Sequence, residues 1–387
     1  MTPLKRWHIG VLIVFYFMSV SMTALYTRMP EIKQLLGVNS SQLGLILLAG
    51  AAGSMSTIPF SGKLVARFGT KPIIAIAFTV CMLALTGMSF AALNGSVPLV
   101  VFTLFLTFAG AALTDVSINV DGSQVEQQLK KSVMPRMHAF FSLGAFSGAG
   151  IATAAMALKI DLATQTLILS AISIAIPFVL WKNFPAHTGQ DLHHKDKTEV
   201  EKDPYSPWKN PIIPLLGLGI LGMTIAEGAT NDWLTLGFVE GLGQTTTNAG
   251  LAFVILQVGM VGSRFFGGAL VDKIGRRKTL EVLAIAGSVG LLLVIFTHNI
   301  VLAWIGAALW GAGVSMAFPL FLGAAGEGKH SAKDVGAVAT FGYAAFLIGP
   351  PILGLVAQNI GILNMFLLLV GFLAMSFFFA RATEPKK

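Results

Sequence analysis

Long stretches of the chain lack any charged residue, and polar or turn-forming residues interrupt them near their middle. Residues 72–114, 282–326 and 335–380 contain no Asp, Glu, Lys or Arg. A helix needs about 20 apolar residues to cross a bilayer, so each run is long enough for two crossings. The interruptions are Asn94-Gly95-Ser96, His298-Asn299 and the segment from Gln358 to Asn364. Each run therefore predicts two transmembrane helices joined by a turn.

The same pattern extends over the whole chain and predicts an all-α membrane protein with twelve transmembrane helices. Helices are favoured because backbone polar groups in lipid must be satisfied within the segment. A membrane barrel would need alternating segments of about ten residues, which the sequence lacks. The predicted spans are 8–27, 42–63, 72–93, 98–122, 135–157, 162–182, 211–236, 247–270, 279–297, 300–325, 334–357 and 361–380.

Composition supports this pattern and excludes several functions. The chain of 387 residues is 55% hydrophobic and 11% charged, and its mean hydropathy is +0.76. A soluble domain carries about 25% charged residues. The single cysteine, Cys81, excludes a disulfide framework. Phosphate-binding loops, nucleophile elbows and zinc signatures are absent from the sequence, so we expect neither an enzyme nor a cofactor.

Basic residues predict the orientation. With both termini inside, 22 of the 26 Lys and Arg residues lie on the cytoplasmic side, and only Arg28, Lys33 and Lys159 lie in outer loops. This asymmetry is typical of inner-membrane proteins. It accounts for the net charge of +8 without a nucleic-acid partner. We therefore expect a multi-pass inner-membrane protein with cytoplasmic termini, acting as a monomer in the lipid bilayer.

A polar segment at residues 185–210 divides the chain into an N-terminal half, 1–184, and a C-terminal half, 211–387. Its composition is typical of a flexible linker. His187, His193 and His194 could bind a metal there, but a solvated linker is the preferred interpretation, and we expect no metal site.

The two halves share an internal repeat. Residues 44–71 align without gaps on residues 250–277, at an offset of 206. The aligned glycines are Gly44, Gly53, Gly62 and Gly69, which fall on Gly250, Gly259, Gly268 and Gly275. A duplicated six-helix unit with parallel halves is a known transporter architecture.

The second copy ends in GALVDKIGRRK, which resembles the signature loop of the major facilitator superfamily. The first copy has Ala66 in place of the acid and Thr70 in place of a basic residue. The resemblance implies two six-helix halves related by a pseudo-two-fold axis, and secondary transport by alternating access. It also implies gating by Asp272, Arg276 and Arg277, with Asp272 latching against the start of the fifth span near Arg136.

Acidic residues inside the spans are candidates for proton coupling, since buried charges are rare and usually functional. Asp115 and Asn119 share a helical face and resemble the acid and asparagine of fucose:proton symporter-like bacterial permeases. This resemblance implies that Asp115 carries the proton. Those permeases have a further acid in their first span, which is missing here, so fucose itself is not an expected substrate. A structural acid is the alternative.

Glu227, in the seventh span, is a second candidate for proton coupling. Arg264, in the eighth span, is placed with the gating residues; it could also neutralise Asp115, bind an anionic substrate, or extend to the interface. The residues predicted to bind substrate mix amides with aromatic rings, as sugar sites do. They are Asn119, Asn231, Gln257, Trp310 and Tyr343. Packing is the alternative for each ring.

Three functions remain open at this point. The favoured one is proton-coupled symport of a small polar solute, such as a sugar or sugar derivative. A proton-driven exporter of drugs or metabolites is the second. A membrane sensor on a transporter fold is the third, because a fold does not fix a function.

Overall fold

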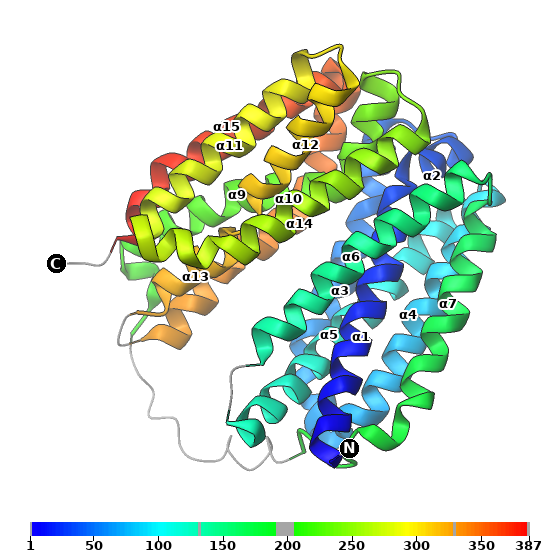
Figure 1. Ribbon diagram of the computed structural model, residues 1–387, viewed down its shortest axis with the longest axis vertical. Helices are drawn as coiled ribbons and strands as arrows, with labels where there is room; N and C mark the ends of the chain where they lie inside the picture. Colours follow the sequence, from blue (N-terminus) through cyan, green and yellow to red (C-terminus); the bar gives the residue numbers. More distant parts are fainter. Residues whose placement is uncertain (1, 131–132, 191–204, 328–329, 385–387) are drawn as a thin grey trace. The chain divides into compact units, whose positions relative to one another are not determined.

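The computed structural model describes residues 2–130, 133–190, 205–327 and 330–384. Twelve helices in these residues are long and apolar enough to cross a membrane, which confirms the predicted all-α transmembrane fold (Figure 1). They belong to two compact units, Met1–Val38 with Ile46–Lys202, and Asn39–Leu45 with Asp203–Lys387. Part of the predicted linker, including His193 and His194, lies outside the described residues.

The first unit contains six of the spanning helices and a short helix between the first two. α1 packs along α6 and against α5, while α4 packs along α5 and α7 (Figure 1). The short helix α2 was not predicted; a proline lies in its first turn, and Gly37, with φ 63°, ends it. The helices are α1 (Pro3–Thr27), α2 (Met29–Leu36), α3 (Ser40–Phe68), α4 (Thr70–Leu93), α5 (Val97–Leu129), α6 (Met134–Ala157) and α7 (Leu162–Val179), followed by the turn η1 (Trp181–Asn183).

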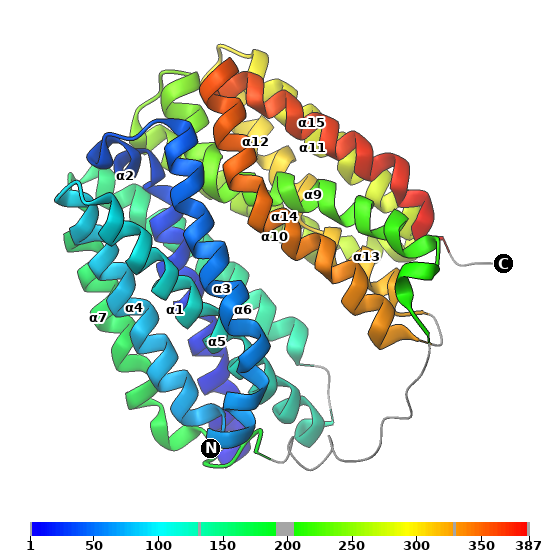
Figure 2. The ribbon, with the colours of Figure 1, turned by 180° about the vertical axis from the view of Figure 1, so that it is seen from behind.

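The second unit repeats this packing. Its first spanning helix, α9, packs along α14 and α15, and α11 packs along α12 and α15 (Figure 2). The helices are α9 (Ile212–Leu236), α10 (Thr246–Ile274), α11 (Arg276–Phe296), α12 (Ile300–Val314), α13 (Ala317–Ala325), α14 (Ser331–Ile360) and α15 (Ile362–Phe379). Single turns are η2 (Pro207–Lys209), the π-helical η3 (Gly237–Gly241) and η4 (Ala380–Thr383).

Two aligned glycines of the sequence repeat lie close to the backbone of the corresponding helix in their own units. A Cβ on Gly53 of α3 would collide with the backbone carbonyl of Phe105 on α5. A Cβ on Gly259 of α10 would collide with the carbonyl of Ala308 on α12. Small residues allow transmembrane helices to approach this closely. The aligned glycines thus have a structural cause, which supports the inferred duplication.

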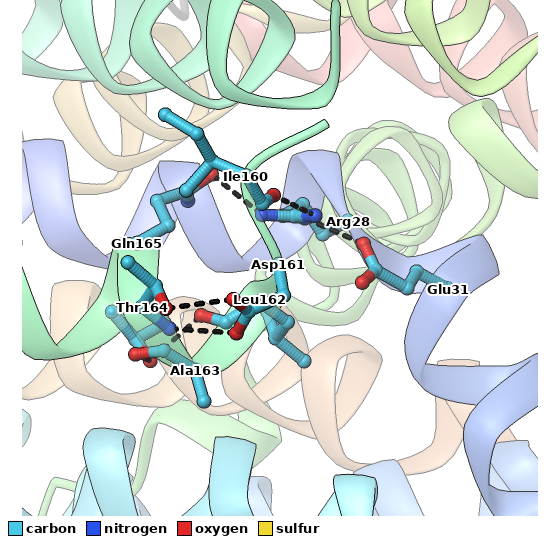
Figure 3. Close-up of polar contacts among 9 residues, drawn as sticks. Arg28, Glu31, Ile160, Asp161, Leu162, Ala163, Thr164 and Gln165 are labelled. Carbon is cyan, nitrogen blue, oxygen red and sulfur yellow. Dashed lines mark hydrogen bonds and ion pairs between the residues drawn. The ribbon is translucent and has the colours of Figure 1, made fainter. Parts of the chain in front are cut away.

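Arg28 links three segments of the first unit at the end predicted to lie outside (Figure 3). Its side chain is 4% exposed, and its Nε donates to Glu31 Oε2 at 2.6 Å. Nη1 donates to the Gln165 side chain at 3.0 Å, and Nη2 donates to the Ile160 carbonyl at 2.8 Å. A buried arginine is stable only when paired in this way. The cluster fastens α1 and α2 to the start of α7.

Asp161 precedes α7 and caps its N-terminus (Figure 3). Its Oδ1 accepts the backbone N–H of Thr164 at 2.9 Å, and its Oδ2 accepts the Thr164 hydroxyl at 2.7 Å. These hydrogen bonds favour the carboxylate and hold the pKa of Asp161 below its ordinary value. The start of the sixth span is thereby fixed by a single acidic residue.

Candidate functional site

A break in the tenth span creates the polar centre of the second unit. The sequence predicts one helix over residues 300–325, but α12 ends at Val314 and α13 begins at Ala317. Pro319 explains the break, because a proline has no N–H to donate to the carbonyl four residues earlier, and its ring crowds that carbonyl. That carbonyl belongs to Ser315 and needs another donor.

Arg264 supplies this donor and connects the break to Glu227. Its Nε donates to Ser315 O at 3.1 Å, and its Nη2 donates to Glu227 Oε1 at 3.0 Å. The Glu227 side chain is 14% exposed and that of Arg264 is 41% exposed. One guanidinium therefore joins α10 to α9 and to the interrupted tenth span. The charge of Arg264 is balanced inside its own unit by Glu227, a different partner from the Asp115 considered in the sequence analysis.

Two amide side chains lie on the same helical faces as this ion pair. Asn231 follows Glu227 by one turn on α9, and Gln257 precedes Arg264 by two turns on α10. Gln257 is 6% exposed, and Asn231 is half-buried. Neither amide has a hydrogen-bond partner among the described residues. Their donors and acceptors are therefore available to a polar ligand.

The two aromatic residues predicted to bind substrate differ in their surroundings. Trp310 is fully buried, its Nε1 donates to the Ala226 carbonyl at 3.1 Å, and its ring lies edge-on to Phe366. This geometry supports the packing interpretation of Trp310. Tyr343 is 49% exposed, with its ring centroid 6.3 Å from that of Phe318. Tyr343 is therefore accessible, unlike Trp310.

The acid and asparagine predicted on the fourth span lie together in the first unit. The Asn119 amide Nδ2 donates to Asp115 Oδ1 at 3.2 Å and to the Asp115 backbone carbonyl at 2.8 Å. Both side chains are half-buried in α5. The uncharged residues 97–114 of α5 precede them. The structure thus gives Asp115 one amide donor and, within the described residues, no cation.

The predicted gating arginines pair within the second unit. Arg276 donates to Glu327 at 2.8 Å, and Arg277 donates to Glu281 at 2.6 Å and to Glu384 at 3.2 Å. These contacts connect the start of α11 to the segment after α13 and to the C-terminal segment. Asp272 and Arg136 are exposed and belong to different units. The latch between them stays a prediction.

Three residues that determine polar contacts in the two units were not found from the sequence. Pro319 and Ser315 were overlooked because the apolar run continues across them, although a proline inside a predicted span signals a freed carbonyl. Asp121, on α5, was overlooked beside Asp115, yet it is fully buried and accepts a hydrogen bond from Thr70. Thr70 stands where the second copy has a basic residue. This difference could have indicated that an acid nearby, here Asp121, lacks a charged partner.

The chain is similar to known membrane transporters in sequence. The family model described as Major Facilitator Superfamily matches residues 9–328. An uncharacterised MFS-type transporter of Yersinia pestis is 26% identical over 348 residues, covering 89% of this chain and 88% of the relative.

Two solved structures show the same fold. A variant of the nucleoside transporter NupG has a TM-score of 0.79 and 13% identity, covering 99% of this chain and 100% of the other. A variant of the E. coli fucose:proton symporter FucP has a TM-score of 0.60 and 18% identity, covering 98% of both chains.

Proposed function

Because this chain belongs to the major facilitator superfamily, we propose that it is a proton-coupled symporter of a small polar solute, such as a sugar or sugar derivative. Membership of the family and the twelve spans make it a multi-pass secondary transporter in a lipid bilayer, without enzymatic activity. The coupling ion and the class of solute are the proposal. The observation that supports proton coupling is the setting of Asp115, which has an amide donor but no cation among the described residues.

Asp115 carries the proton in this proposal. A carboxyl group inside an apolar helix can exist in charged and neutral forms of comparable free energy when hydrogen bonding offsets part of the cost of burial. The Asn119 amide, 3.2 Å away, offers a donor to the ionised form. Because Asp115 is half-buried, protons can reach it. Its protonation removes a negative charge from the fourth span. The free-energy cost of moving this helix past apolar surroundings is then lower.

Glu227 acts as the second proton-coupling group. Protonation of its carboxyl group would weaken the ion pair with Arg264 at 3.0 Å. Arg264 would then keep its bond to Ser315 O but lose its attachment to α9. The bend of the tenth span would thereby become free to move relative to α9. A solute hydroxyl or carboxylate could accept the released N–H of Arg264.

The solute is held by amides and an aromatic ring. Asn231 and Gln257 keep free hydrogen-bonding groups in the second unit, Tyr343 offers a partly exposed ring, and Asn119 serves the first unit. Hydroxyl groups of a sugar match the amides, and its apolar ring face matches an aromatic ring. The two structural neighbours, described as transporting a nucleoside and fucose, are compatible with such a solute.

The remaining proposals concern orientation and assembly. We place both termini in the cytoplasm, because the basic residues concentrate on that side. We place the protein in the inner membrane as a monomer. Asp272 and Arg136 form the cytoplasmic latch that the family resemblance implies.

Proton movement in vesicles tests the proposal. Purified protein is reconstituted in vesicles that contain a pH-sensitive dye, and hexoses, deoxyhexoses and nucleosides are added in turn. Solute-induced proton entry is expected for the wild type and should be lost in Asp115→Asn. Asp161→Asn is the matched control, since it makes the same chemical change at an exposed helix cap, where asparagine serves equally well.

Two outcomes would contradict the proposal. Solute uptake without proton movement would exclude proton symport, and proton entry that survives in Asp115→Asn would exclude Asp115 as the carrier. If no solute moves protons, dye efflux from energised vesicles would instead support the proton-driven exporter.

A further inference from the structure

Asp121 is a buried acid for which the proposed transport cycle gives no role. It lies six residues after Asp115 on α5, and its side chain is 0% exposed. Its Oδ1 accepts a hydrogen bond from Thr70 Oγ1 at 3.0 Å. Its Oδ2 is buried and has no hydrogen-bond partner in the described part of the chain. The indole of Trp7 on α1 lies beside it, with a buried Nε1 that also lacks a partner there.

The second unit contains the same contact with a different donor. Thr70 falls on Arg276 at the repeat offset of 206, and each is the first residue of its helix. The glycine before each has the same conformation, with φ 80° and ψ 162° in one unit and φ 83° and ψ 162° in the other. Arg276 donates to Glu327 at 2.8 Å, and the separation of 51 residues equals that between Thr70 and Asp121.

The two equivalent contacts thus differ in charge: Arg276 and Glu327 form an ion pair, whereas Asp121 has Thr70 where its counterpart has a cation. The Arg276–Glu327 pair is partly exposed, with side-chain exposures of 23% and 49%. Asp121 is completely buried, and the donors beside it, the Thr70 hydroxyl and the Trp7 indole, are both neutral. An ionised carboxylate without a counter-charge is strongly disfavoured in such a place. A neutral carboxylic acid removes this conflict.

No charged group near Asp121 replaces the missing arginine. The charged and titratable residues on the adjoining parts of the neighbouring elements are Lys5, Arg6 and His8 on α1, Lys63 and Arg67 on α3, Lys71 on α4, Asp115 and Glu126 on α5, Arg136 and His138 on α6, and Lys182 and His187 after α7. Asp121 forms an ion pair with none of the described residues among them. Lys71, the closest in sequence to Thr70, lies over the Trp181 ring at 4.5 Å.

The segment after α7 covers the same position. The backbone N–H of Thr70 donates to the Thr188 carbonyl at 2.9 Å. A Cβ on Gly189 would contact side chains of Val65, Thr70 and Val120, so this segment packs closely over the start of α4. The cover keeps water away from Asp121 and reinforces the preference for a neutral form.

We propose that Asp121 is a further proton-binding group, separate from Asp115 and Glu227, which holds a proton in the arrangement described here and exchanges it with water at the end of the first unit that contains the N-terminus. Its role in transport rests on the proposed proton coupling, whereas its protonation does not. Deprotonation requires Thr70, Trp7 or the segment around Thr188 to admit water or a cation. The protonation state of Asp121 therefore depends on whether water or a cation can reach it from that end of the unit.

Infrared difference spectroscopy of the full-length protein in lipid nanodiscs tests the inference. A rise in pH should remove a carboxylic-acid carbonyl band from the wild type. That band should be missing at every pH in Asp121→Asn and present in Asp115→Asn. Thr70→Arg copies the charged contact of the second unit, and it should also abolish the band because the guanidinium holds Asp121 ionised.

The inference is overturned if the spectra of Asp121→Asn and wild type are identical at all pH values. It is also overturned if Thr70→Arg keeps the band at wild-type strength, a result that remains informative should Asp121→Asn fail to fold. The measurement needs no solute, so its failure would leave the proposed symport intact. Conversely, solute uptake without proton movement would contradict the proposed symport and would leave the Asp121 band unchanged.

Discussion

Replacement of Arg28 by methionine tests how strongly the cluster at the start of α7 stabilises the first unit. Methionine keeps much of the length of the side chain but removes all three of its hydrogen bonds. Glu31 would keep a negative charge without its partner, and the Gln165 carbonyl would remain buried without a donor. Removing one partner of a buried ion pair costs about 3–5 kcal/mol. Glu31 is 25% exposed, so we expect the lower limit, about 3 kcal/mol.

This loss should be visible as a lower unfolding temperature. For a unit of this size, 1 kcal/mol corresponds to roughly 2–4 °C, which gives a decrease of roughly 6–12 °C for Arg28→Met. Tryptophan fluorescence during heating of the purified protein measures it. The half-life at a fixed temperature should be recorded as well, because membrane proteins often unfold irreversibly.

Two controls separate charge from geometry. Arg28→Lys keeps the charge but not the planar donor arrangement, so its unfolding temperature should lie between those of wild type and Arg28→Met. Lys159→Met removes an exposed positive charge from the same end and should have no effect. The interpretation is refuted if Arg28→Met unfolds at the same temperature as Lys159→Met.

Further substitutions test other parts of the structure. Glu227→Gln and Arg264→Gln should each reduce solute-driven proton entry in vesicles, and the double variant should lose little more than either single variant, because the two residues act as a pair; independent, additive losses would contradict this. Gly53→Ala should lower stability by about 1–3 kcal/mol, because a Cβ collides with a carbonyl of α5, and an unchanged melting temperature would exclude that close contact. Asp161→Ala should lower stability by at most about 1 kcal/mol at neutral pH. Since the folded state lowers the pKa of Asp161, this contribution is present above the unfolded pKa of about 3.9 and disappears as pH falls through the lower folded value, so wild type and variant should converge in acid. Asp272→Asn should increase labelling of cysteines introduced on the side predicted to be cytoplasmic, and unchanged labelling would count against the latch.

The sequence predicts the spans well because lipid imposes one simple requirement on them. Long uncharged runs correspond to helices, and the predicted interruption at Asn94-Gly95-Ser96 lies between α4 and α5. Helical spacing also predicts that Asp115 and Asn119 share one face of their helix, and the Asn119 amide donates to Asp115 Oδ1 at 3.2 Å. These features depend on residues close in sequence, where the geometry of one helix is sufficient.

Contacts between helices were less accessible to sequence reasoning. The ion pair of Arg264 with Glu227 joins residues 37 positions apart, and no local pattern specifies which acid faces the arginine. The break at Ser315 has a local cause in Pro319, but prolines also occur inside the continuous helices α3 and α14. A proline inside a predicted span therefore does not by itself predict an interruption.

The relation between Pro319, Ser315 and Arg264 has an evolutionary consequence. Pro319 leaves the Ser315 carbonyl without a backbone donor, and Arg264 from another helix donates to it instead. A residue with a backbone N–H at position 319 could donate to Ser315 itself, so substitutions at position 264 would then be better tolerated. Among relatives, positions 264 and 319 should therefore change together, and a lineage that loses the proline should tolerate loss of the arginine more readily than one that keeps it.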